Sequence, residues 1–175
     1  MQTAALLLAM LMGCGAMAHA QQEPGANAAD GKSIDSLVTA VYEVLSGPAE
    51  QKRDWNRFRA LFVPGAHLVP VSPQPGGGFA GRVLSVEDYI VRTEPLLARE
   101  GFYEQEAGRR SQQWGHIAHV FSTYESRHAK GEKPFMRGIN SIQLINDGRR
   151  WWVLSVLWDR ESPEQPLPES YLKRE

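Results

Sequence analysis

The chain has 175 residues and a formal net charge of −1, from 19 basic and 20 acidic side chains. It contains no basic block and no acidic tail, which argues against nucleic acid as a partner. Charged residues make up 22% of the chain and aromatic residues 9%, a composition typical of a folded domain and not of a disordered chain. The length suits one domain with a substantial core.

Residues 1–20 are predicted to be a secretory signal peptide. An apolar run from Ala4 to Met12 precedes Ala18-His19-Ala20, an A-x-A cleavage site. The run is too short for a membrane span, and no later segment is long enough. We therefore expect a periplasmic or secreted protein that begins at Gln21 after cleavage. The first residues carry no Lys or Arg, which departs from the usual signal pattern.

A second interpretation of this segment involves Cys14, the only cysteine in the chain. Residues 11–14 (LMGC) resemble a bacterial lipobox, in which Cys14 would be lipidated and would become the mature N-terminus. Cleavage after Ala20 would instead leave a mature chain without cysteine and therefore without a disulfide. The mass of the mature N-terminal peptide distinguishes the two alternatives.

The pattern after the signal predicts a flexible leader over residues 21–32 and then three helices. Ser33 is a candidate N-cap for an amphipathic helix that ends near residues 46–48. A second helix is expected over residues 49–62, stopped by Pro64-Gly65. A short strand over residues 66–71 and a Pro/Gly-rich loop over residues 73–78 follow. Ser85 is the candidate cap of a third helix, which Pro95 should kink or split.

Four strands are expected after Gly101. The first, over residues 102–113, is polar and suits an edge position. The others lie in residues 114–127, 135–145 and 149–160, and Asn146-Asp147-Gly148 predicts a hairpin between the last two. Residues 161–175 carry three prolines and are expected to form an extended, loosely held tail.

This order of elements resembles the nuclear-transport-factor-2-like superfamily, also called the SnoaL-like or cystatin-like α+β cone. The resemblance covers about residues 33–160 and rests on loose motifs: Trp55 to Phe62 followed by Pro64-Gly65-Ala66, and Gly148 followed by residues 151–158. It implies an α+β fold with three N-terminal helices packed on a strongly curved, mainly antiparallel sheet that leaves a pocket at its wide end. Members include dehydratases, ketosteroid isomerases, epoxide hydrolases, polyketide cyclases and non-catalytic modules, and they commonly form dimers through the sheet.

A two-residue turn at Asp147 and Gly148 would place Asn140 opposite Ser155 on one apolar face. Both faces of this hairpin are rich in large apolar residues, so we expect both to be covered, one by the helices and the other by a second subunit. Asn140 and Ser155 would form a polar pair in an apolar pocket. A buried structural hydrogen bond explains the pair equally well, and a register slip of one residue would exchange the faces.

The residues give weak support to catalysis. Asp54, Glu125, Asp147 and Asp159 are better explained by helix capping, ion pairs, a turn and a strand end than by acid/base chemistry. His67 is a candidate base, with a core-edge histidine as the alternative explanation. His116 and His119 are three residues apart on a strand and face opposite sides, so they cannot share a metal. We expect neither a metal nor a cofactor.

Aromatic residues from separate elements are the better indication of a ligand pocket. The expected ligand-binding residues are Tyr42, Trp55, His67, Tyr89, Tyr124, Asn140 and Ser155. The leading hypothesis is an exported, non-catalytic, dimeric domain that binds a small apolar molecule. The alternatives are a lyase or isomerase that uses His67 as the base and Tyr124 or Asn140 to polarise a carbonyl, and a structural or accessory partner of an envelope protein.

Overall fold

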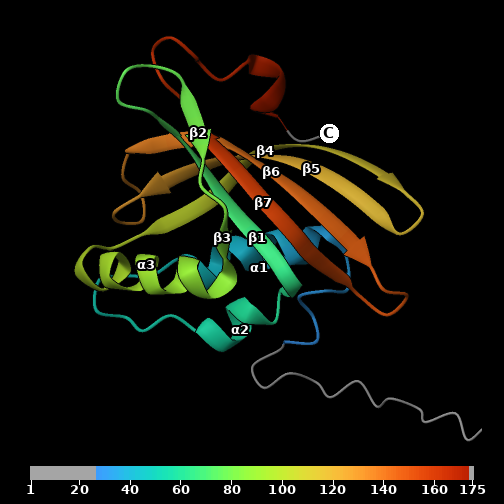
Figure 1. The fold of residues 1–175 in the computed structure, drawn as a ribbon. Helices are drawn as coiled ribbons and strands as arrows, with labels where there is room; N and C mark the ends of the chain where they lie inside the picture. The colour runs from blue at the N-terminus through green and yellow to red at the C-terminus, as the bar shows by residue number, and fades with distance from the viewer. Residues whose placement is uncertain (1–26, 174–175) are drawn as a thin grey trace, which may run out of the picture.

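The computed structural model describes residues 27–173, and the predicted signal and Cys14 lie outside them. Three helices and a seven-stranded sheet make up the fold (Figure 1). The helices are α1 (Ile34–Leu45), α2 (Trp55–Arg59) and α3 (Val86–Arg99), with a 3-10 turn η1 (Glu169–Tyr171) near the C-terminus. The strands are β1 (Phe62–Pro73), β2 (Phe79–Gly81), β3 (Leu84–Ser85), β4 (Tyr103–Trp114), β5 (Ile117–Arg127), β6 (Met136–Asn146) and β7 (Trp151–Arg160).

The sheet has the order β2-β1-β7-β6-β5-β4, with β3 paired to β1. All neighbours are antiparallel except β1 and β7, which are parallel. The sheet curves around the helices, which lie on its inner face (Figure 1). The α+β class, the mainly antiparallel sheet and the edge position of the polar strand are therefore confirmed.

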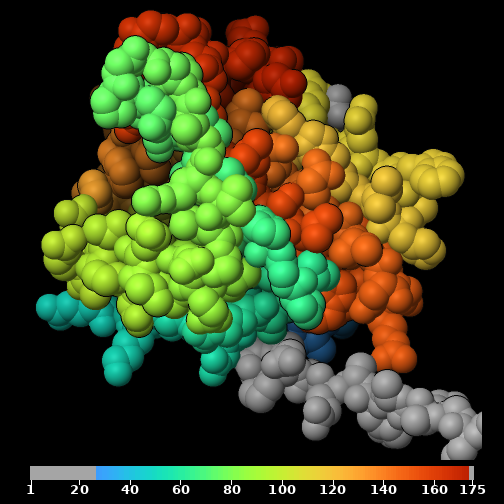
Figure 2. Space-filling model, in the orientation of Figure 1, coloured from blue at the N-terminus to red at the C-terminus, as the bar shows by residue number. Residues whose placement is uncertain are grey.

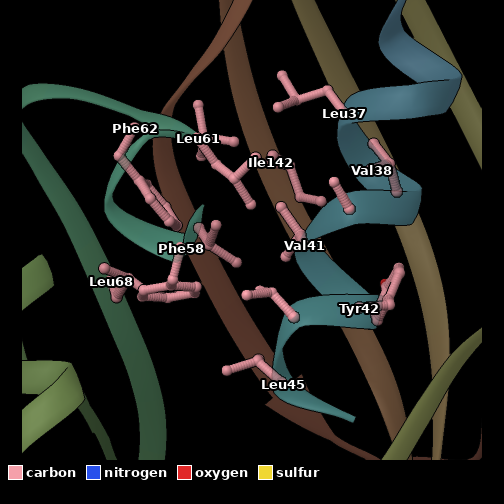
Figure 3. Packing of buried hydrophobic residues seen from close by; sticks show 14 of the residues in the cluster. Leu37, Val38, Val41, Tyr42, Leu45, Phe58, Leu61, Phe62, Leu68 and Ile142 are labelled. Atoms are coloured by element: carbon pink, nitrogen blue, oxygen red, sulfur yellow. The ribbon is translucent and has the colours of Figure 1, made fainter. Parts of the chain in front are cut away.

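The core lies between the helices and the inner face of the sheet. Leu37, Val38 and Val41 of α1 pack toward Ile142 of β6, and Phe58 of α2 packs near Leu68 of β1 (Figure 3). Ser33 caps α1 and Ser85 caps α3, each through a capping box, as their positions in the sequence predict. Because α1 is apolar on one side and polar on the other, burying that side fixes its orientation on the sheet.

The second helix is shorter than predicted, because most of residues 46–54 form an irregular link. The buried guanidinium of Arg53 donates to the carbonyl oxygens of Leu45, Gly47 and Gln51 at 2.7, 2.9 and 2.6 Å. These bonds satisfy carbonyls that a continuing helix would otherwise pair. Pro64 and Gly65 lie within β1, where its pairing with β7 shifts, and α3 runs through Pro95 without a break in its helical assignment.

The pairing of β6 with β7 differs from the predicted register at two places, the turn and a bulge. The turn is a four-residue loop, because Asn146 pairs with Trp151 and the Asp147 carboxylate accepts the N–H groups of Arg149 and Arg150 at 2.8 Å. A bulge at Leu154 then shifts the pairing by one residue.

The bulge exchanges the two faces in the second half of β7. Asn140 therefore lies opposite Trp158, whereas Ser155 lies opposite Gln143 on the outer face. The predicted Asn140–Ser155 pair is wrong.

The C-terminal segment lies on the outer face of the sheet near β4 and β5 and is not loose. Thr123 donates to the carbonyl of Tyr171 at 2.6 Å, Arg110 donates to the carbonyl of Ser170 at 2.9 Å, and the rings of Phe121 and Tyr171 are 5.8 Å apart. A side chain at Gly108 would collide with the Tyr171 carbonyl, so the glycine permits this close approach. Further along the outer face, Leu154 and Leu157 remain exposed.

Candidate functional site

Glu104 is the carboxylate that the fold places beneath α1. It pairs across the sheet with Ser126, which is fully buried on the inner face, and the Ser126 hydroxyl donates to Glu104 Oε1 at 3.0 Å. Ser46 at the end of α1 holds the same residue through its backbone, accepting from the Glu104 N–H at 3.0 Å. None of the salt bridges described for residues 27–173 involves Glu104.

Burial without a cationic partner raises the pKa of Glu104 to about 7, although the Ser126 hydroxyl acts in the opposite direction. The negative charge of Glu104 also affects the pKa of three nearby tyrosines. The pKa of Tyr42, Tyr89 and Tyr124 is raised, first by burial and then by the negative charge of Glu104. The carboxyl therefore titrates near neutral pH, whereas the phenols keep their protons.

A buried hydrogen-bond chain runs beside Glu104 from β6 to β4. Asn140 Nδ2 lies 3.0 Å from the Tyr42 hydroxyl, which lies 2.7 Å from Ser122 Oγ, and Ser122 Oγ lies 2.5 Å from Glu106 Oε1. Each hydroxyl has one proton. Since Ser122 donates to the carboxylate, Tyr42 must donate to Ser122, and the Tyr42 oxygen must accept from the Asn140 amide.

Arg109 completes this chain at its outer end. Its guanidinium donates to Glu106 at 2.7 and 2.8 Å and also contacts Asp35 at the start of α1. The side chains of Glu106 and Arg109 are only 4% and 8% exposed, so the pair is shielded from solvent. A bulge in β4 between Glu106 and Gly108 allows Glu106 and Arg109 to face inward together.

Tyr124 lies at the centre of the inner face and is 1% exposed. Its hydroxyl is buried and has no hydrogen-bond partner among the described residues. It lies against Gly138, where a Cβ would come within 2.6 Å of the hydroxyl oxygen. An unpaired buried hydroxyl is costly in free energy, which makes it a candidate for binding a polar ligand atom or a water molecule.

A pocket of about 780 Å³ opens next to these groups, between α1, β4 and the loop from β5 to β6. The residues that line it are Thr39, Tyr42, Glu43, Ser46, Tyr103, Glu104, Gln105, Glu106, Arg127, Lys130, Gly131 and Glu132. Its volume is in the range of small-molecule sites. Glu104 and Tyr42 connect the pocket to the buried polar groups.

The structure brings only part of the predicted ligand set together. Tyr42, Tyr124 and Asn140 lie on the inner side near Glu104. Tyr89 and Trp55 flank Phe58, with ring centroids 5.5 and 5.7 Å from it, in an aromatic cluster that also contacts Trp158. The Trp55 indole donates to Glu94 at 3.0 Å.

His67 and Ser155 lie elsewhere. They are paired with each other across β1 and β7, and the neighbours of His67 on β1, Ala66 and Leu68, are buried on the opposite side. His67 is exposed and therefore cannot act as the base inside the cone. Among residues 27–173 no group of three or more His, Cys, Asp or Glu side chains could hold a metal ion.

Sequence analysis missed Glu104 and Glu106. The available signal was their spacing, because residues two apart on a strand share a face and β4 follows the third helix directly. An edge strand that carries two glutamates is ordinarily solvated, so the pattern alone favours exposure. Only the position of α1 over β4 shows that this face is covered.

Comparisons with known proteins support the fold. A cystatin-like protein of unknown function from Nostoc punctiforme matches with a TM-score of 0.56 and 14% identity, covering 77% of this chain and 92% of its own. An NTF2-like protein of unknown function from Pseudomonas putida gives 0.55 and 12%, covering 77% and 90%. A protein from Parabacteroides distasonis, provisionally named a ketosteroid isomerase, gives 0.50 and 13%, covering 82% and 99%.

At these identities the similarity concerns the fold and not the activity. No family model and no curated protein matches the sequence. The order of elements, the curved sheet and the similar solved structures agree with the resemblance drawn from the sequence: the chain has the nuclear-transport-factor-2-like, or cystatin-like, fold.

Proposed function

We propose that the protein binds a small molecule in the pocket beside Glu104 and that Glu104 transfers a proton to or from it, as in an isomerase or a lyase. The observation that carries this proposal is a carboxyl with a pKa of about 7 that lines a pocket and has no cationic partner among the described residues. A base whose pKa lies near neutrality combines availability with proton-transfer strength.

The proposed chemistry begins with a proton on carbon next to a carbonyl group. The Glu104 carboxylate accepts that proton, and the electron pair moves onto the carbonyl oxygen. The buried Tyr124 hydroxyl has no partner among the described residues and does not line the pocket, so it would donate a hydrogen bond to this oxygen only for a substrate that extends past Glu104. Return of the proton to a different carbon gives an isomer, whereas loss of a leaving group gives an elimination product. Neither route requires a cofactor.

A non-catalytic binding domain is the second candidate. It is favoured by the chain from Asn140 to Arg109, whose bonds run in one direction and end in an ion pair without a ligand. Such a chain stabilises a core as well as it positions a reactive group. In this case Glu104 and Tyr124 would provide hydrogen bonds to a small, largely apolar molecule and no proton would move.

The two candidates differ in proton exchange. The protein would be incubated in D2O with a panel of cyclic and linear ketones, and loss of the α-proton would be followed by NMR. We expect exchange above the buffer rate that disappears in Glu104→Gln and persists in Glu164→Gln, a matched control at an exposed position. Ketones that bind without exchange, or exchange that survives in Glu104→Gln, would contradict the catalytic role.

Export and dimer formation also belong to this proposal. A signal cleaved after Ala20 predicts a mature peptide that starts at Gln21, and a lipidated Cys14 predicts a heavier, detergent-soluble product; mass spectrometry separates them. The exposed Leu154 and Leu157 on the outer face support a homodimer formed through the sheet. Light scattering after size exclusion tests it, and a monomer at high micromolar concentration would contradict it.

A further inference from the structure

The pocket beside Glu104 has a rim that belongs to the loop between β5 and β6. This loop contributes Arg127, Lys130, Gly131 and Glu132 to the lining. Another wall is formed by α1, and neither α1 nor any other helix in residues 27–173 is long and apolar enough to cross a membrane. Figure 2 shows the loop as the brown atoms at the left edge of the molecule, above α3. Residues 128–133 are exposed, so an entering ligand meets this loop first.

The rim loop is held in shape by its own hydrogen bonds. The Arg127 side chain donates to the Glu132 carbonyl at 2.7 Å, and the Ala129 N–H donates to the Glu132 carboxylate at 3.1 Å. At the end of the loop the rings of His128 and Phe135 are stacked, with centroids 4.1 Å apart. The loop therefore fixes the position of the Glu132 carboxylate at the rim before a ligand arrives.

Carboxylates outnumber cations around this pocket. The charged lining residues are four acids, Glu43, Glu104, Glu106 and Glu132, and two bases, Arg127 and Lys130. The ion pairs that these residues enter do not reverse the balance. Arg57 is shared by Glu43 and Asp30, and Arg109 is shared by Glu106 and Asp35. With Glu125, the partner of Arg127, the whole set holds seven carboxylates and four cations.

The arginines near the rim are committed to other partners. Arg127 pairs with Glu125 and also bonds to the loop backbone. Arg53 lies close to Tyr103, but its buried guanidinium donates to backbone carbonyls in the link before α2. Counting Arg53 with the other cations still leaves the carboxylates in excess. The pocket would therefore repel an anionic ligand and attract a cationic one.

Lys130 marks where a positive charge can lie in this pocket. Its ammonium group is 5.8 Å from the centre of the Tyr103 ring, in a cation–π contact. Lys130 is exposed and enters none of the salt bridges described within residues 27–173. It can therefore leave the ring without breaking an ion pair there. The face of Tyr103 is then open to a cation from a ligand.

We propose that the pocket selects ligands that carry a protonated amine and holds this group at the rim, against the Tyr103 ring and the Glu132 carboxylate. An aromatic face and a carboxylate are the two kinds of contact that an organic ammonium group makes most favourably. The inference rests on the binding proposed for this pocket, and it names an amino ketone as the class of substrate for Glu104. A nearby positive charge favours the anionic form of an acid, so the amine would also ease removal of the α-proton.

The test compares ketones of nearly equal shape and different charge. The probes are 4-(dimethylamino)cyclohexanone, which is protonated at pH 7, neutral 4-isopropylcyclohexanone and anionic 4-oxocyclohexanecarboxylate. We expect NMR titration at low salt to show that the amine binds about tenfold more tightly than the neutral ketone, with the carboxylate weakest. The preference should shrink as salt is added, because the rim is exposed.

Charge preference and proton transfer are separated by repeating the titrations with Glu104→Gln. The preference for the amine should persist in this variant, because Tyr103 and Glu132 supply it, whereas α-proton exchange should disappear. Exchange in the parent protein without a preference for the amine would overturn this inference alone. A preference for the amine without exchange would keep the inference and remove the catalytic role. Binding of none of the three ketones would contradict both.

Two substitutions in the loop should change amine binding in opposite directions. Glu132→Gln should weaken it several-fold, whereas Lys130→Gln should strengthen it several-fold by removing the competing cation. Lys133→Gln is the matched control, because Lys133 is exposed in the same loop but does not line the pocket. Melting curves of all three variants should coincide with that of the parent protein. Unchanged amine binding in Glu132→Gln and Lys130→Gln, or tighter binding of the carboxylate by the parent protein, would overturn the proposal.

Discussion

The interior of this fold has two different halves on one sheet. Between α2, α3, β1 and β7 it is aromatic: Phe58 packs against Tyr89 and Phe62, with ring centroids 5.5 and 4.8 Å away. Between α1, β4 and β5 it is polar, with Glu104, Glu106 and Arg109 beneath the helix. The aromatic half stabilises the fold by burial, whereas the polar half holds groups whose burial must be offset by hydrogen bonds.

The aromatic half mainly stabilises the fold, whereas the polar half holds the groups that could bind a ligand. In the aromatic half the rings pack on one another, and the polar atoms of Trp55 and Tyr89 bond to Glu94 and Thr93. In the polar half most groups are satisfied by one another, yet Glu104 has no cation and the Tyr124 hydroxyl has no partner among the described residues. Groups left in this condition are expected where a ligand supplies what the protein does not. The following predictions test that division.

The largest effect is expected in the aromatic half. Phe58→Ala removes a ring that is fully buried and contacts Trp55, Phe62 and Tyr89. Deleting such a ring should lower the free energy of unfolding by about 3 to 5 kcal/mol. Urea denaturation measures it, and the exposed Phe79→Ala should change it by less than about 0.5 kcal/mol. A small loss for Phe58→Ala would mean that the aromatic half is loosely packed.

Glu104→Gln should make the protein more stable above neutral pH. The pKa of Glu104 rises from 4.5 to about 7 on folding, so the folded state holds its proton more tightly than the unfolded state. Stability is therefore lost as pH rises from about 4.5 to 7, by about 3 kcal/mol in total, and stays low above that range.

The difference in unfolding free energy between the parent and Glu104→Gln, measured from pH 4 to pH 9, isolates this effect. It should approach zero in acid and grow toward pH 7, in the opposite direction to carboxylates such as Glu161, whose pKa is lowered by the Leu167 N–H and by Arg137. Glu164→Gln should leave the profile unchanged. A flat difference for Glu104→Gln would show that the Glu104 carboxyl is solvated.

Ser122→Ala should have an intermediate effect. It removes the acceptor of the Tyr42 proton and one of the donors to Glu106 inside the core. Leaving a buried donor unpaired costs about 1 to 3 kcal/mol, measured by urea denaturation. Ser141→Ala on the outer face, where the serine hydroxyl lies 2.9 Å from His119 Nε2, should cost about 1 kcal/mol or less. Equal losses for the two serines would argue against a directed chain.

Tyr124→Phe should change stability least of these variants and should still lower proton exchange. The hydroxyl that it removes makes no hydrogen bond within the described chain, so the unfolding free energy should stay within about 0.5 kcal/mol of the parent. If the Tyr124 hydroxyl stabilises a developing oxyanion, proton exchange should fall about a hundredfold or more. A large loss of stability with unchanged exchange would reverse the roles assigned to the two halves.

The sequence predicts the fold well because local signals and tertiary packing agree there. Serine caps, apolar periodicity and strand alternation each identify an element without reference to the others, and the polar character of residues 102–113 identifies an edge strand. The second helix is shorter than its apolar spacing predicts. Residues before it are held by hydrogen bonds from Arg53, and residues from Phe62 onward belong to β1.

The site was predicted only in part. The periodicity of helix and strand faces is enough to predict that Tyr42, Tyr124 and Asn140 point inward. Glu104 can be predicted only if the position of α1 over β4 is known. Ser155 is expected inside from a register that lacks the bulge at Leu154, whereas His67 is a candidate because it lies between apolar residues on a short strand. Bulges depend on how two strands fit against a third element, and nothing in the alternation of residues 149–160 marks this one.

That single extra residue divides β7 into two half-strands with opposite facing. Before Leu154 the odd-numbered residues point inward, and after it the even-numbered residues do, which is how Trp158 reaches Tyr89. In a strand that kept all of these residues in regular pairing, Ser155 and Leu157 would instead face the core, and Val156 and Trp158 would face solvent. The aromatic half of the interior therefore depends on Leu154, a half-exposed residue, being left out of the strand pairing.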